Sequence, residues 1–113
     1  MEVVLVGIGG VFGAWFRYVV SQLLASRSFP WATLVVNVLG SFVLGIMLFA
    51  GVSRPVTLLV GIGFCGAFTT FSSFSYQTVE LWERDRPDLA VINAVGNLVV
   101  SVLAFGCAWL LVS

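Results

Sequence analysis

Apolar residues fill four long stretches of the chain, and short polar turns separate these stretches. A helix that crosses a bilayer needs about 20 predominantly apolar residues. The stretches lie at about 3–24, 31–51, 56–83 and 89–112, and each of them reaches that length. The pattern predicts an all-α membrane protein in which residues 1–113 form a single domain of four transmembrane helices, running alternately up and down.

The third stretch departs from this pattern because its second half is polar. At about 28 residues it exceeds one straight span. Its first half is apolar and rich in glycine, whereas residues 69–78 mix hydroxyl and aromatic side chains. We expect two half-helices joined by a break near residues 66–69. A break within a membrane is tolerated only where protein or water covers the freed backbone groups, so it should face the protein interior.

Polar side chains recur at a spacing of four in the second and fourth stretches. Residues four apart share one face of a helix, so each set forms a polar stripe. Such side chains can hold helices together or line a polar path, and the number of asparagines favours a lining. The stripes are Thr33, Asn37 and Ser41 on one helix, and Asn93, Asn97 and Ser101 on the other.

Two glycines in the first stretch have the same spacing. Gly9 and Gly13 lie four residues apart and therefore share a helix face. Small residues at such positions let the backbone of another helix approach closely. We expect this face of the first helix to pack against a neighbouring helix.

Composition agrees with a membrane protein and excludes several other classes. Hydrophobic residues make up 60% of the chain and charged residues 9%, against about 25% charged residues in soluble domains. The net charge of zero argues against nucleic acid as a partner. The chain has no His and no Lys, so it lacks the commonest general base and metal ligand, and we predict that it is not an enzyme. Cys65 and Cys107 are isolated and are interpreted as small buried hydrophobes.

The arginines leave the orientation of the chain in the membrane open. Three of them lie on one side of the predicted bundle and one on the other: Arg27, Arg84 and Arg86 against Arg54. So weak a bias does not select one orientation, and insertion both ways would permit an antiparallel homodimer. Arg17 lies inside the first span. It either extends to the interface or faces the interior, where it would anchor buried carbonyls or form the positive wall of an anion vestibule.

The polar half of the third stretch carries two phenylalanines in a hydroxyl-rich setting. Phe71 and Phe74 are three apart and interleave with Ser72 and Ser73. Apolar packing is the ordinary role of a single phenylalanine, but the serines favour a wet lining. The positive edge of a phenyl ring can meet an anion, and weak sites let an ion leave again. No carboxylate lies in the middle of a span, so the inventory suits a small anion.

The predicted break would also leave backbone carbonyls unpaired. Broken helices in membranes present such carbonyls to cations such as Na⁺. A kink that serves packing alone, without an ion, is the alternative interpretation.

Three motifs in these stretches resemble those of a known family. They are GVFGAWFRY at 10–18, TLVVNVLGSF at 33–42 and GAFTTFSSFS at 66–75. Together they resemble the motifs of the small bacterial fluoride channels of the CrcB or Fluc family, and the third motif is the most specific. The fourth span resembles the family only in the spacing of its polar residues.

The resemblance implies a dual-topology, antiparallel homodimer with two fluoride pores, surrounded by lipid in the bacterial cell inner (plasma) membrane. It implies that Asn37 lines each pore and that Phe71 and Phe74 are paired ring sites. It also implies a structural Na⁺ at the centre of the dimer, held by the backbone carbonyls of Gly66 and Thr69 from both subunits.

Further residues acquire expected roles from the same resemblance. Arg17 matches an arginine of the family's first span, and we assign it with Thr33 to a vestibule or to a structural role. The remaining candidates for the pore are hydroxyl and amide side chains of the third and fourth spans: Thr70, Ser72, Ser73, Asn93, Asn97 and Ser101.

Three positions depart from the pattern of the family. Ala32 stands where the family often has glycine, and Asn93 stands where an aromatic hydroxyl is more usual. Ala67 replaces a second glycine at the predicted break, where a side chain leaves the backbone less freedom.

The function that these features predict is passive export of fluoride through a selective channel, which lowers cytoplasmic fluoride and confers fluoride resistance. Two alternatives remain. One is a small proton-coupled multidrug exporter, which needs a membrane-embedded carboxylate that the first span lacks beyond Glu2. The other is a scaffold subunit of a larger membrane complex, whose polar stripes would be covered by partner helices.

Overall fold

The structure, a computed structural model, describes residues 1–25 and 28–112 and contains no strand among them. Three of its helices are long and continuous: α1 (Glu2–Leu23), α2 (Trp31–Ala50) and α6 (Pro87–Val112). Together with the segment Arg54–Glu83 they give four helical stretches long and apolar enough to cross a membrane. The prediction of an all-helical protein with four potential spans is confirmed.

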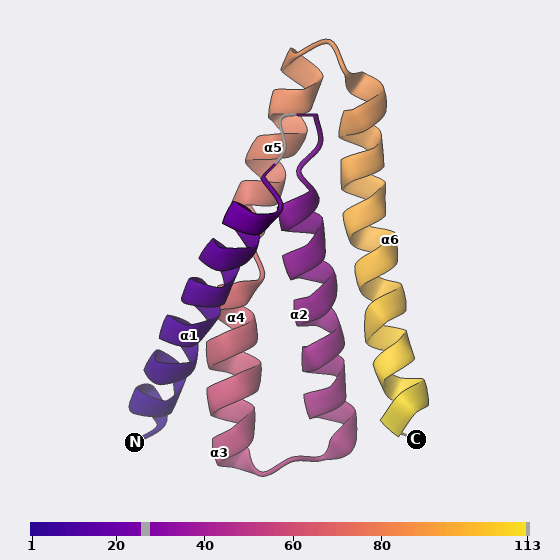
Figure 1. Cartoon of the computed structure of the whole chain (residues 1–113). Helices are drawn as coiled ribbons and strands as arrows, with labels where there is room; N and C mark the ends of the chain where they lie inside the picture. The colour runs from indigo at the N-terminus through magenta and orange to yellow at the C-terminus, as the bar shows by residue number, and fades with distance from the viewer. Residues whose placement is uncertain (26–27, 113) are drawn as a thin grey trace.

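These stretches run alternately up and down, with α2 between the third stretch and α6 (Figure 1). α1 begins and α6 ends at the same end of the molecule, which also carries the connection that follows α2. The turn that leads into α6 lies at the opposite end. α2 packs mainly along α6, and α1 packs mainly along the third stretch.

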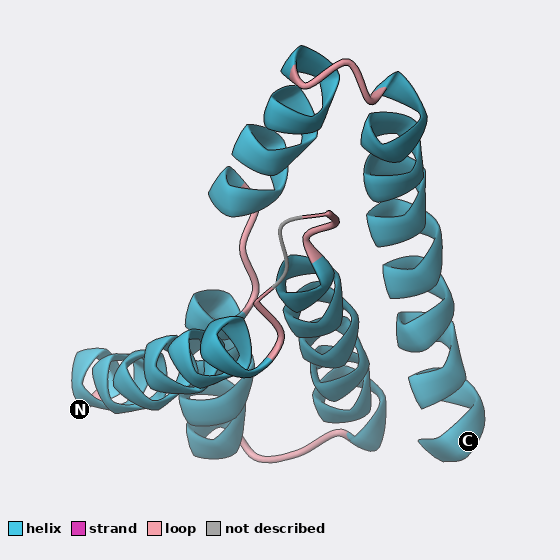
Figure 2. Ribbon diagram, turned by 45° about the horizontal axis from the view of Figure 1, so that its top comes forward, coloured by secondary structure: helices cyan, strands magenta, loops and turns pink. Residues whose placement is uncertain are grey.

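The third stretch consists of several helical pieces. α3 (Arg54–Val56) leads into a π-helix, η1 (Thr57–Cys65), which the sequence did not predict, and then into α4 (Gly66–Phe68). A second helix, α5 (Ser72–Glu83), follows after a non-helical link at residues 69–71. The link appears as a loop between two helices in Figure 2.

The link lies further along the chain than the predicted break near residues 66–69. Gly66 is helical, with φ −61° and ψ −36°, and the backbone first becomes extended at Thr69, where ψ is 159°. The reason is a hydrogen bond: the Thr70 N–H donates to the side chain of Asn37 at 2.8 Å instead of continuing the helix. Ala67 therefore lies in an ordinary helical turn, where alanine is favourable.

The predicted packing role of Gly9 and Gly13 is confirmed. Both glycines are buried in the contact between α1 and η1. A Cβ atom at Gly9 would overlap the carbonyl oxygen of Leu59, and one at Gly13 would overlap that of Phe64. The absence of side chains thus sets how closely α1 approaches the first half of the third stretch.

Apart from Arg17, which lies within α1, the charged residues among those described lie near the two ends of the bundle. Arg54 lies at the end where α1 begins and forms an ion pair with Glu2, with 2.9 Å between Nη2 and Oε1. Arg84 and Arg86 flank the turn before α6, at the opposite end. The predicted separation of Arg54 from these two is confirmed, whereas Arg27 lies outside the described residues.

Candidate functional site

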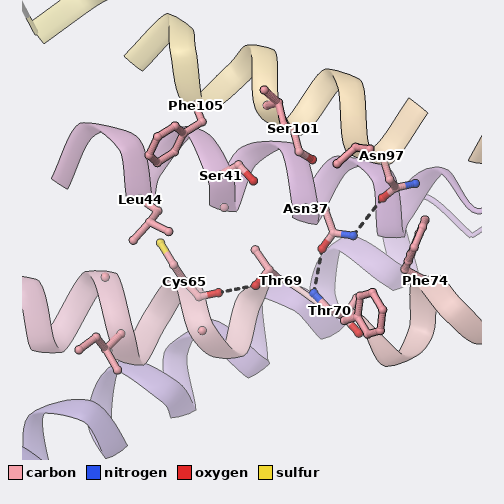
Figure 3. A pocket seen from close by; sticks show the side chains of 17 residues that line it. Asn37, Ser41, Leu44, Cys65, Thr69, Thr70, Phe74, Asn97, Ser101 and Phe105 are labelled. Atoms are coloured by element: carbon pink, nitrogen blue, oxygen red, sulfur yellow. Dashed lines mark hydrogen bonds between the residues drawn. The ribbon is translucent and has the colours of Figure 1, made fainter. Parts of the chain in front are cut away.

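A cavity of about 810 Å³ opens between α2, the third stretch and α6. Figure 3 shows side chains from these elements converging on it. The described residues that line it include no charged side chain. Eight of the residues predicted to line the pore or to bind Na⁺ lie in its wall: Asn37, Gly66, Thr69, Thr70, Phe71, Phe74, Asn97 and Ser101.

Asn37 joins the three walls of this cavity. Its Oδ1 accepts the hydrogen bond from the backbone N–H of Thr70 at 2.8 Å, and its Nδ2 donates to Oδ1 of Asn97 at 2.9 Å. Both bonds are drawn in Figure 3. Asn37 therefore fixes the non-helical link on one side and α6 on the other, while it faces the cavity itself.

The two predicted ring residues lie side by side on the wall. The ring centroids of Phe71 and Phe74 are 5.9 Å apart and the ring planes are inclined by 45°. Phe71 is 78% exposed in the single chain, whereas Phe74 is partly buried. The Ser73 N–H donates to Oγ1 of Thr70 at 3.1 Å, so Thr70 stabilises the start of the helix that carries Phe74.

A second cavity, of about 480 Å³, lies toward the end of the bundle that carries Arg84 and Arg86. Arg17, Thr33, Ser72 and Ser73 line it, so the structure separates these predicted residues from the ring pair. Thr70 lines both cavities.

Arg17 is exposed at the wall of this second cavity. In the described part of the chain it makes no hydrogen bond or ion pair, so the predicted role as an anchor for buried carbonyls has no contact to support it. A free guanidinium at a polar cavity instead supplies positive charge to that cavity.

Two other predicted residues have unusual surroundings. Asn93 is 0% exposed and lines neither cavity, and its Oδ1 accepts a hydrogen bond from Nδ2 of Asn97 at 2.9 Å. Its Nδ2 donates to Oγ1 of Thr78 at 2.8 Å. Ser101 lines the larger cavity, and its Oγ is buried without a hydrogen-bond partner among the described residues.

Gln77 and Thr78 contribute to the site but were not predicted from the sequence. Oε1 of Gln77 accepts a hydrogen bond from Thr33 at 2.6 Å at the second cavity. Thr78 donates to the carbonyl oxygen of Phe74 at 2.8 Å. The available signal was their spacing, since they lie three and four residues after Phe74 and so share its helix face.

Comparison with known proteins places this chain in a family. Residues 4–109 match the family described as CrcB-like protein, Camphor Resistance (CrcB). A protein of Haloarcula marismortui named fluoride-specific ion channel FluC 2 is 51% identical, over 93% of this chain and 88% of its own length. A fluoride-specific ion channel FluC of Methanocaldococcus jannaschii is 43% identical over 87% of this chain and 83% of its own.

The similarity extends to a more distant relative. The protein named fluoride-specific ion channel FluC 2 of Clostridium acetobutylicum is 34% identical over 93% of this chain and 92% of its own length. These relatives are named as ion channels, which agrees with the prediction that the chain is not an enzyme. With a match over nearly its whole length, the chain belongs to the CrcB-like family.

Proposed function

We propose that this chain is the subunit of a fluoride-selective channel that lets fluoride leave the cytoplasm passively. The observation that carries the proposal is the larger cavity, in which an asparagine amide and two phenyl rings lie together without a charged side chain among the described lining residues. Relatives named fluoride-specific ion channels at 34–51% identity support the same conclusion.

The side chains of this wall favour conduction of an anion over conduction of a cation. A conducting cation site would use carboxylates or converging carbonyls, whereas the side chains here offer N–H groups, hydroxyls and ring edges. The positive edges of Phe71 and Phe74 attract an anion weakly. Weak attraction suits conduction, because an ion that is held tightly does not leave.

The two cavities give the ion a route along the chain. In this proposal fluoride enters the second cavity, where Arg17 raises the local anion concentration and Ser72 and Ser73 offer hydroxyl donors. It passes Thr70, which lines both cavities, and reaches the ring pair. Ser101, whose hydroxyl has no partner in the described chain, would offer a further donor in the same wall. Asn97 lies in this wall too, and Asn93 accepts its hydrogen bonds.

The non-helical link is the proposed mid-membrane break of the third span, and its carbonyls fit a Na⁺ ion. Because the Thr70 N–H donates to Asn37, the carbonyl of Gly66 lacks its usual helical donor four residues on. The carbonyls of Gly66 and Thr69, at and just before the link, are the proposed ligands, and both residues line the larger cavity. A Na⁺ ion there would neutralise carbonyl dipoles and hold the link in place.

A second copy of the chain would add ligands to such an ion site. Two carbonyl oxygens are fewer than the six or so that hard, oxygen-liganded cations take, and an antiparallel copy would raise the number to four. Its packing would also cover Phe71, which is 78% exposed in the single chain. We therefore propose a dual-topology, antiparallel homodimer surrounded by lipid in the bacterial cell inner membrane.

Flux measurements on the purified protein test the function directly. Liposomes that contain the protein and a fluoride gradient should release fluoride when a potassium ionophore balances the charge, and should release chloride far more slowly. Protein-free liposomes are the control. Absence of fluoride release, or equal release of chloride, would contradict the proposal.

The same measurement separates the two alternatives. A scaffold subunit would give no flux on its own. A proton-coupled exporter would need a proton gradient and an embedded carboxylate, whereas Glu2 lies at the start of α1 and is paired with Arg54.

A further inference from the structure

All three asparagines of the sequence belong to one hydrogen-bonded network that joins α2, α6 and α5. Nδ2 of Asn37 donates to Oδ1 of Asn97 at 2.9 Å, and Nδ2 of Asn97 donates to Oδ1 of Asn93 at 2.9 Å. Nδ2 of Asn93 then donates to Oγ1 of Thr78 at 2.8 Å. These four residues are called the amide network below.

Backbone groups at both ends fix the direction of the amide network. At one end the Thr70 N–H donates to Oδ1 of Asn37, and at the other the Thr78 hydroxyl donates to the carbonyl oxygen of Phe74. An N–H group can only donate and a carbonyl can only accept. If one amide were reversed, two acceptors or two donors would face each other, and a buried polar group without a partner is costly. The two ends therefore determine the orientation of every amide between them.

The orientation of these amides decides which of their N–H and C=O groups remain without a partner and can face the larger cavity. Asn97 uses its Nδ2 on both Oδ1 and the backbone carbonyl of Asn93, and its Oδ1 accepts from Asn37. The oxygen of Asn37 is occupied by Thr70, and one of its two N–H groups is occupied by Asn97. The remaining N–H belongs to the side chain that lines the cavity. Asn37 thus offers a donor, the edge that an anion needs.

We propose that Asn93 and Thr78 are positioning residues that hold this donor edge of Asn37 in place. Neither of them lines either cavity, and Asn93 is 0% exposed. Their influence would reach Asn37 through Asn97. The amide network also starts and ends on the segment that carries the two phenyl rings, at Thr70 and at Phe74. It therefore sets the geometry of the Asn37 donor and of the ring pair together.

The consequence for transport rests on the proposed fluoride channel, but the orientation itself can be measured without transport. The sequence has only three asparagines, so selective ¹⁵N labelling gives three side-chain amide signals by NMR. Single substitutions of Asn37, Asn93 and Asn97 assign them. The test variant is Thr78→Val, which keeps the shape of the side chain and removes the hydroxyl that terminates the amide network.

We expect Thr78→Val to shift the amide signals of Asn93, Asn97 and Asn37, and to slow fluoride efflux about tenfold, because Asn93 loses a buried acceptor. Thr78→Ser, which retains the hydroxyl, should restore both. Thr57→Val is the matched control, since Thr57 makes the same type of bond to the carbonyl of Ser53 but lies outside the network. Should Thr78→Val fail to fold, Thr78→Ala removes the hydroxyl without introducing the bulk of a valine side chain.

The outcomes are distinct. An unchanged Asn37 signal in a folded Thr78 variant would overturn the proposal, whatever the efflux, and so would equal effects of Thr57→Val and Thr78→Val. If the wild-type protein shows no fluoride efflux at all, the proposed function fails, while the three amide signals still decide whether Thr78 orients Asn37.

Discussion

The two halves of the third stretch are held in the molecule by different forces. The first half, from Arg54 to Phe68, packs against α1 through contacts in which glycine allows backbone to meet backbone. The second half, from Ser72 to Glu83, is joined to α2 and α6 by side-chain hydrogen bonds. Steric contact tolerates no added atoms but has little directionality, whereas hydrogen bonds orient the groups that they join. The first half thus sets the position of the wall, and the second half sets which atoms it presents.

The largest effect is expected from adding one methyl group to the first half. Gly13→Ala places a Cβ where the carbonyl oxygen of Phe64 lies, and overpacking of this kind costs about 1–3 kcal/mol or more. We expect a lower temperature of unfolding, measured by size-exclusion chromatography after heating, and loss of fluoride efflux as a consequence.

Gly7→Ala is the matched control for this change. Gly7 lies on the same helix, but a Cβ there would meet nothing within 4 Å. It should leave stability unchanged or raise it, because alanine favours helix. Equal destabilisation by the two variants would show that close backbone contact does not position the first half.

Changes to the rings should instead affect transport and leave the fold intact. Phe71→Ile and Phe74→Ile keep an apolar side chain of similar bulk but remove the ring edge that attracts an anion. We expect each variant to slow fluoride efflux from liposomes by at least about tenfold, a change of about 1.4 kcal/mol in the barrier. Their elution profile and thermal stability should match those of the wild type. Unchanged efflux in both variants would remove the rings from the mechanism.

The smallest effect is expected from the exposed ion pair that connects α1 with the start of the first half. The side chains of Arg54 and Glu2 are 71% and 63% exposed, and exposed pairs contribute about 0.2–1 kcal/mol. Glu2→Gln should lower thermal stability slightly and leave efflux unchanged. Arg54→Gln should behave alike, and the double variant should add nothing further. A large loss of efflux in either would show that this end of the molecule takes part in transport.

The sequence predicted the helices and the polar faces well because these follow from local rules. Apolar length identifies the spans, and a spacing of four placed Asn37 and Asn97 on faces that meet in the structure. Gly9 and Gly13 identified a packing face for the same reason.

The hydrogen bonds between different spans could not be predicted, because they depend on how far one helix is shifted along another. The non-helical link at residues 69–71 meets the predicted break near residues 66–69 only at Thr69 for this reason. Glycine favoured Gly66, but the side-chain oxygen of Asn37 on α2 accepts a hydrogen bond from the N–H of Thr70. Asn93 shares a stripe with Asn97 yet lines neither cavity, and Thr78 of α5 accepts its hydrogen bond. Neither relationship is encoded in the spacing of residues within one helix.

An even number of potential spans has a consequence for joining two copies of this chain. α1 begins and α6 ends at the same end of the bundle (Figure 1). If two copies lie antiparallel, as proposed, the end of one and the start of the next are on opposite sides of the bilayer. No water-soluble linker can join them in tandem without reversing one copy. A single-chain version of the pair therefore requires an additional helix of about 20 apolar residues as the linker.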